Sequence, residues 1–156
     1  MKSGIGQDSH AFLAEKGEKC CIIAGVHFDD VPGWDADSDG DIAYHAICNA
    51  ITSITHVPIL GGIAIKMCHE QKITDSREYL LEALKTLGNV QVVHLALTIE
   101  ARRPRMQKKI DEMRQNIAEV MRLEMTQVGI TCTSGDGLTA FGRGEGGQCF
   151  CIITVN

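Results

Sequence analysis

Three residues in the first third of the chain have the types and spacing to hold a metal ion. Asp8 and His10, in the run "QDSH", lie two positions apart, so on a strand both side chains project from one face. His45 lies on the polar side of a helix-like run, one turn from its start. Two imidazoles and one carboxylate make a three-ligand set that leaves the fourth position of a tetrahedral zinc ion open. The alternative is that His45 is simply solvated on the helix surface. The other histidines have no comparable partners, and we expect them to be structural: His27, His56, His69 and His94.

The acidic run "DADSDGD", Asp35 to Asp41, suggests a different cation. It begins like an EF-hand calcium loop, with acidic residues at loop positions 1, 3 and 5 and glycine at position 6. A loop that starts at Asp35 would place Ala46 at position 12, where an EF-hand needs a bidentate glutamate. We therefore reject the calcium loop. Asp39 or Asp41 is instead expected to cap the helix that follows.

A glycine-rich stretch near the C-terminal end, "TCTSGDGLTAFGRGEG", suits a phosphate group. Glycines let backbone N–H groups approach an anion closely, and Arg143 offers a planar fork for phosphate oxygens. Asp136 is a lone carboxylate of the kind that holds Mg²⁺ or Mn²⁺ between phosphates. The alternative is a surface loop whose glycines serve only its turns.

Interleaved strands and helices must position these groups. Alternating or continuous apolar runs predict strands over 4–10, 20–28, 90–101, 127–134 and 148–156. Helical periodicity predicts helices over 41–55, 74–88 and 107–122, with a glycine-rich link over 58–64. The pattern indicates one domain over residues 1–156. We expect an α+β (α/β) fold with one mixed sheet and helices packed on one of its faces.

Composition sets limits on the class of protein. The chain has 156 residues, 44% of them hydrophobic, and a formal charge of −5, which argues against a nucleic-acid partner. No apolar run approaches the roughly 18 residues that span a membrane, and no signal or transit peptide is evident, so we expect a cytoplasmic protein. The seven cysteines match neither a zinc ribbon nor a redox pair, and we expect buried free thiols.

Taken together, five segments resemble the 2-C-methyl-D-erythritol 2,4-cyclodiphosphate synthase family of the non-mevalonate isoprenoid pathway. They follow the family's order over nearly the whole chain: "GIGQDSHAF", "SDGDIAYHAICNAI", "TDSREYLLEAL", "TIEARRPRM" and "TSGDGLTAFGRGEG". The resemblance implies a phosphorus–oxygen lyase that works as a homotrimer with active sites at subunit interfaces. In 4-diphosphocytidyl-2-C-methyl-D-erythritol 2-phosphate, the 2-phosphate attacks the β-phosphorus, CMP leaves, and a cyclic diphosphate forms.

The resemblance also implies a set of site residues. Zn²⁺ would be held by Asp8, His10 and His45, and a Mg²⁺ or Mn²⁺ ion by Asp136 together with the substrate diphosphate. Asp37 and Ser134 are expected to be catalytic. The residues expected to contact the substrate are Asp8, His10, Asp37, Ser38, Gly62, Ile63, Ala64, Ala101, Arg102, Arg103, Pro104, Arg105, Met106, Gln107, Thr133, Ser134, Gly135, Asp136, Ala140 and Arg143.

Some positions depart from the family's pattern. Asp37 stands where the family usually has a histidine, and Gly62-Ile63-Ala64 stands where it has a D-I-G loop. Gln7 and Ala140 replace aromatic residues at the trimer axis, which alters the family's apolar cavity for isoprenoid diphosphates. We therefore expect a divergent synthase that keeps its metal ligands. Two alternatives stay open: a metal-dependent nucleotide-diphosphate hydrolase or transferase on the same scaffold, and a non-catalytic isoprenoid-diphosphate binder.

Overall fold

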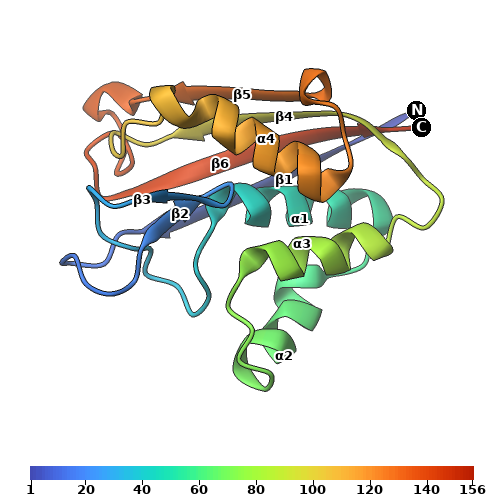
Figure 1. Cartoon of the computed structure of the whole chain (residues 1–156), viewed down its shortest axis with the longest axis horizontal. Coiled ribbons are helices and arrows are strands. Elements are labelled where there is room, and N and C mark those ends of the chain that lie inside the picture. The colour runs from blue at the N-terminus through green and yellow to red at the C-terminus, as the bar shows by residue number, and fades with distance from the viewer.

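A mixed four-stranded sheet forms the frame of the molecule in a computed structural model that describes all 156 residues (Figure 1). Its strands are β1 (Lys2–Ala11), β4 (Val92–Glu100), β5 (Val128–Thr133) and β6 (Gly146–Val155), in the order β1-β6-β4-β5. Strand β6 pairs antiparallel with both β1 and β4, whereas β4 and β5 are parallel. The expected α+β fold with one mixed sheet is confirmed.

Helices cover one face of this sheet, as expected (Figure 1). Helices α1 (Ile42–Thr55) and α4 (Ile110–Met121) pack on the sheet, and α3 (Ser76–Lys85) packs against α1. Shorter helical turns are η1 (Ile59–Ile63), η2 (Gln107–Lys109), η3 (Met125–Gln127) and η4 (Gly135–Gly137). Under the helices, the inward side chains of β4 and β6 alternate with outward ones and are buried.

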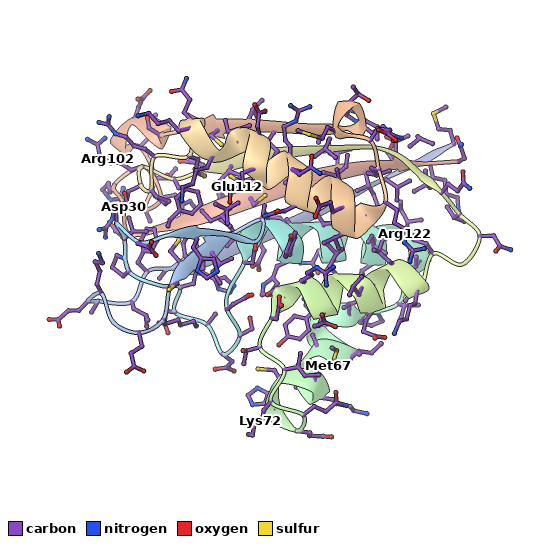
Figure 2. All side chains as sticks on the ribbon, in the orientation of Figure 1. Asp30, Met67, Lys72, Arg102, Glu112 and Arg122 are labelled. Atoms are coloured by element: carbon purple, nitrogen blue, oxygen red, sulfur yellow. The ribbon has the colours of Figure 1, made fainter.

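The segment expected as a glycine-rich link is helical instead. Residues 59–63 form η1, and α2 (Ala64–His69) follows directly, extending away from the sheet (Figure 1). Gly61 and Gly62 favoured a loop, but Ile59, Ala64 and Met67 are buried and supply an apolar face. Met67 and Lys72 mark this projecting part of the molecule in Figure 2.

The run expected as a single strand over 20–28 is a hairpin. Strand β2 (Cys21–Ile23) pairs antiparallel with β3 (Val26–Phe28), separate from the main sheet. Ala24 and Gly25 both have positive φ angles, 51° and 71°, which suits a tight two-residue turn. The continuous apolar run hid this turn because only one of its two residues is a glycine.

Two glycines bring α1 unusually close to β1. A Cβ atom on Gly6 would lie 2.1 Å from the carbonyl oxygen of Ala46, and one on Gly4 would lie 2.4 Å from that of Ala50. Asn49 also donates a hydrogen bond of 2.9 Å to the Gln7 carbonyl. The start of α1 is thereby held against the end of β1, which is the approach that the metal prediction requires.

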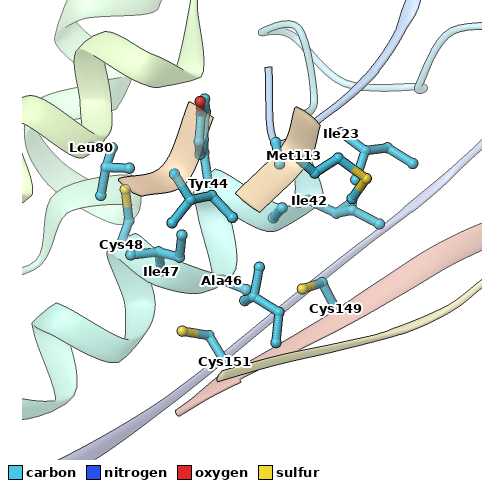
Figure 3. Packing of buried hydrophobic residues seen from close by; sticks show 14 of the residues in the cluster. Ile23, Ile42, Tyr44, Ala46, Ile47, Cys48, Leu80, Met113, Cys149 and Cys151 are labelled. Carbon is cyan, nitrogen blue, oxygen red and sulfur yellow. The ribbon is translucent and has the colours of Figure 1, made fainter. Parts of the chain in front are cut away.

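Buried free thiols contribute to the core between α1 and the sheet (Figure 3). Cys149 and Cys151 point inward from β6, and Cys21 and Cys48 are also buried. Cys20 and Cys68 are only partly buried, and the expectation is wrong for Cys132, which lies exposed on the edge strand β5. An edge strand has a neighbour on one side only, so its side chains are covered less well than those of β6.

No single helix is both long and apolar enough to cross a bilayer. Helix α1 and the segment Ile59–His69 would reach that size only together, and they are bent by 110° where they meet.

Candidate active site

The end of β1 and the first turn of α1 bring the three predicted metal ligands together. Asp8 Oδ2 lies 3.0 Å from His10 Nε2 and 3.0 Å from His45 Nδ1, and the two ring nitrogens are 3.5 Å apart. Tetrahedral zinc with bonds of 2.0–2.1 Å would separate its ligand atoms by about 3.3 Å. The donor types and their spacing therefore fit a metal ion, as the sequence predicted.

The carboxylate of this set is ionised at neutral pH. Burial would raise the pKa of Asp8, but hydrogen bonds and charge from His10 and His45 lower its pKa to about 2. An ionised Asp8 is the form that a divalent cation needs as a ligand.

His45 is held by a buried chain of hydrogen bonds. Only 7% of the residue is exposed, so it is not a solvated surface histidine. Its Nε2 lies 2.7 Å from the Ser76 hydroxyl oxygen, and that hydroxyl donates to Asp39. The Ser76 oxygen therefore accepts from Nε2–H, which leaves the Nδ1 lone pair free to face a metal. Sequence reasoning missed Ser76; its one signal was a hydroxyl directly after a helix cap.

Two aspartates of the acidic run, Asp39 and Asp41, make structural hydrogen bonds. Asp41 caps α1 and accepts from Ala43 and Tyr44, and it also accepts from Ala24 and Gly25 of the hairpin, at 2.8–3.1 Å. Burial and the nearby charge of Asp39 raise the pKa of Asp41 to about 7, although the backbone donors oppose this. The helix-cap prediction is confirmed for Asp41. Its neighbour Asp39 joins α1 to α3 through the Ser76 backbone and hydroxyl.

A hollow of about 270 Å³ lies over the three ligands. Of the other predicted substrate contacts, Asp37, Ser38 and Ala64 line it, whereas Gly62 and Ile63 do not. His69, at the end of α2, also lines this hollow, and its Nε2 is 3.2 Å from Asp37 Oδ2. His69 was expected to be structural because the sequence showed no partner for it, and the structure places it beside Asp37 and in the lining of this hollow.

A second, larger hollow of about 790 Å³ lies beyond the ends of β4 and β5. The predicted nucleotide-contacting residues gather in it: Ala101, Arg102, Pro104, Arg105, Met106, Gln107, Thr133 and Ser134. Figure 2 shows Arg102 at this end of the molecule. Lys108 and Cys132 also line it and were not predicted. No residue lines both hollows.

Two predicted arginines make contacts within the chain. The Arg103 guanidinium lies 4.9 Å from the centre of the Phe12 ring, and its Nε donates to the Gly144 carbonyl at 3.1 Å. Arg143 pairs with Glu145 at 2.8 Å. Neither arginine lines one of the two hollows, so the prediction that they contact substrate rests on the resemblance alone.

The predicted second metal ligand lies in the glycine-rich turn. Asp136 is exposed, with a positive φ of 49°, and the Ser134 hydroxyl donates to its carboxylate at 3.2 Å. Gly135, the first residue of this turn, and Ala140, which follows it, line neither hollow. The turn thus presents a carboxylate and a hydroxyl to solvent beside the second hollow, where a phosphate-bound cation would have access.

The α+β fold and the set of three metal-ligating side chains both point to one protein family. The chain belongs to the YgbB family, whose model matches residues 1–156. It is 54% identical over 153 residues to the 2-C-methyl-D-erythritol 2,4-cyclodiphosphate synthase of Chlamydia caviae, a match that covers 97% of this chain and 87% of that relative. The resemblance drawn from the sequence motifs is thereby confirmed.

Two solved structures have the same fold as this chain. The bifunctional IspDF of Campylobacter jejuni matches with a TM-score of 0.86 at 25% identity, over 98% of this chain and 41% of that longer chain. IspF of Plasmodium falciparum in complex with CDP matches with a TM-score of 0.80 at 23% identity, over 98% of this chain and 94% of that chain.

Proposed function

We propose that this chain is a 2-C-methyl-D-erythritol 2,4-cyclodiphosphate synthase of isoprenoid precursor biosynthesis. It converts 4-diphosphocytidyl-2-C-methyl-D-erythritol 2-phosphate to the cyclic diphosphate and CMP. The observation that carries the proposal is the intact ligand set of Asp8, His10 and His45, with donor atoms spaced for a metal, in a chain so similar to an enzyme of that name. The reaction class is a phosphorus–oxygen lyase. The cytoplasmic location expected from the sequence stays a prediction.

The residues of the chain position the substrate rather than react with it. Asp8, His10 and His45 would hold Zn²⁺, which would supply Lewis-acid polarisation of a phosphate oxygen. An oxygen of the 2-phosphate attacks the β-phosphorus, the bond from that phosphorus to the bridging oxygen breaks, and CMP leaves with the electron pair. Positioning and charge neutralisation account for most catalysis in phosphoryl transfer, so a protein nucleophile is not needed.

The remaining predicted site residues take supporting parts in this proposal. Asp136 would contribute to a Mg²⁺ or Mn²⁺ site with the substrate diphosphate, and the Ser134 hydroxyl would donate to a phosphate oxygen. The second hollow would take the cytidine, since a structural neighbour was solved with CDP bound. Asp37 and Ser38 would line the reacting end of the substrate.

We also propose that the chain works as a homotrimer with sites between copies. The sheet face opposite the helices exposes apolar side chains that are cross-strand neighbours: Ile5 opposite Ile152, with Phe150 two residues along β6. These side chains are 60%, 49% and 40% exposed, and an apolar cluster of this kind is typical of an interaction surface. No residue lines both hollows, which is consistent with a substrate that lies in the hollow over the three metal ligands of one copy and in the second hollow of its neighbour.

The His45→Ala variant tests the proposal. With Zn²⁺ and Mg²⁺, the wild-type chain should release CMP from the cytidyl-erythritol 2-phosphate. Loss of a metal ligand should lower CMP release by a factor of about 100 or more. His27→Ala is a matched control, because His27 is exposed on β3 and does not line the hollow over Asp8, His10 and His45, here called the metal hollow. Equal turnover by His45→Ala would contradict the proposal.

The hydrolase alternative has one observation in its favour. Asp37 adds a second carboxylate to the metal hollow, and Gly62 and Ile63 line neither hollow, so the pocket for the erythritol differs from the expected one. A panel of plain CDP-alcohols separates cyclisation from hydrolysis. These compounds lack the 2-phosphate nucleophile, so they can be hydrolysed but not cyclised. Zinc-dependent release of CMP from these compounds would favour the hydrolase. Turnover of neither substrate would favour the non-catalytic isoprenoid-diphosphate binder.

A further inference from the structure

We propose that His69 is a phosphate-positioning residue of the metal hollow and that Asp37 holds it in place; this rests on the proposed function. His69 is the last residue of α2, and Asp37 lies on the loop before α1. Their side chains meet at 3.2 Å, between His69 Nε2 and Asp37 Oδ2. Both residues line the same hollow as Asp8, His10 and His45.

The charge balance of the hollow shows why a further donor is needed. Its lining includes two carboxylates, Asp8 and Asp37, and no lysine or arginine. The Lys19 ammonium group donates to the carbonyl of Ala36, a lining residue, but Lys19 itself does not line the hollow. A phosphate beside two carboxylates is repelled unless cations or donors oppose them. Within the lining of the hollow, the metal set, the Ser38 hydroxyl and His69 can do so, and His69 is the imidazole among them that lies outside the metal set.

The two ring nitrogens of His69 have different surroundings. Nε2 faces the Asp37 carboxylate, whereas Nδ1 makes no hydrogen bond within the chain. When both nitrogens carry protons, the ring donates one N–H to Asp37 and has a second N–H available for a phosphate oxygen. The nitrogens of His10 and His45 that face Asp8 are committed to the metal set. His69 is therefore a third imidazole with a separate task.

The exposure of the pair indicates a role in binding rather than in folding. The side chains of His69 and Asp37 are 59% and 79% exposed, and ion pairs this open to solvent contribute little to stability. The same short helix is anchored by buried Met67 and Ala64, so the position of His69 does not depend on the pair alone. Asp37 then acts through His69, which gives a reason for an acid beside a phosphate site.

A variant series at position 69 tests the assignment. Steady-state CMP release would be measured for His69→Ala, His69→Gln and His69→Arg, together with zinc content. We expect His69→Ala to lower kcat/KM by about 10- to 100-fold, the range of a charge-assisted hydrogen bond, with unchanged zinc. His69→Arg should recover part of the loss and His69→Gln less, because only arginine restores the charge. The matched control His27→Ala should stay within about twofold of wild type.

Asp37→Asn provides a second, independent variant. It should lower kcat/KM less than His69→Ala does, and the double variant should be no worse than His69→Ala, because both changes act through one ring. Wild-type kcat/KM in His69→Ala would overturn the assignment. Loss of zinc from His69→Ala would also overturn it, because the residue would then support the metal set.

Binding of inorganic pyrophosphate to the zinc-loaded protein separates this assignment from the proposed function. The affinity of His69→Ala for pyrophosphate should fall by about tenfold relative to wild type, whether or not the wild type turns over substrate. If the wild type releases no CMP, the proposed function fails while this measurement still decides the role of His69. Equal affinities would overturn that role.

Discussion

At His45, one hydroxyl group decides which ring nitrogen can face a metal. The Ser76 hydroxyl donates to Asp39, so its oxygen is left to accept from His45 Nε2–H. Both Ser76 and His45 are buried, which removes competing water from this arrangement. Partners of this kind fix the tautomer and orientation of a ligating imidazole.

Removing that hydroxyl should weaken metal binding without removing a ligand. We expect Ser76→Ala to lower zinc affinity by about 10- to 100-fold, measured by competition with a chelator. Ser76→Thr keeps the hydroxyl and should retain most of the affinity. Ser53→Ala, at an exposed position of α1, is the control. Unchanged zinc affinity in Ser76→Ala would show that the hydroxyl does not orient His45.

The sequence predicts the three metal ligands better than it predicts the residues that contact them or line the same hollow. Asp8 and His10 share a face because a strand has a period of two, and His45 follows from helical spacing. Ser76 and His69 could not be found in this way, because their contacts depend on how α3 and α2 pack against α1. Local periodicity does not encode such tertiary approaches.

At the scale of elements, turns and short helices are where prediction fails. The long periodic segments, including α1, α4 and the four sheet strands, lie close to their expected ranges. The β2–β3 hairpin was missed because Ala24 adopts a positive φ that alanine seldom takes. Helix α2 was missed because a glycine pair precedes it, and burial of Met67 and Ala64 outweighs that signal.

The edge strand β5 offers a chemical probe of the second hollow. Cys132 lines this hollow, with its sulfur 4.0 Å from that of Met106. Although the residue as a whole is exposed, partial desolvation of its sulfur raises the pKa of the thiol to about 11. Because the thiolate is the reactive form, alkylation of Cys132 should be slow at pH 8 and speed up about tenfold per pH unit until pH nears 11.

Bound nucleotide should protect this thiol. We expect CDP to slow alkylation of Cys132 by N-ethylmaleimide at pH 9 by about tenfold or more, measured by peptide mass spectrometry. Cys20, which is partly exposed and lies outside the hollow, is the internal control. Equal alkylation of Cys132 with and without CDP would place the nucleotide elsewhere.

At the scale of the whole molecule, one sheet face is left uncovered. Helices bury the other face, whereas Ile5, Phe150 and Ile152 remain exposed on this one. If copies associate through this face, Phe150→Glu should shift the native mass from three chains toward one and lower CMP release with it. Val90→Glu, at an exposed apolar position in the loop before β4, is the control. An unchanged native mass would exclude this face as the interface.

The proposed metal site at the end of β1 and the start of α1 is expected to serve a cyclisation rather than a hydrolysis. The most direct test is to incubate the purified chain with 4-diphosphocytidyl-2-C-methyl-D-erythritol 2-phosphate, Zn²⁺ and Mg²⁺, and to follow the phosphorus signals by ³¹P NMR. We expect CMP and 2-C-methyl-D-erythritol 2,4-cyclodiphosphate in equal amounts, with neither formed when a chelator removes the metals. CMP without the cyclic product, or no conversion at all, would contradict this expectation.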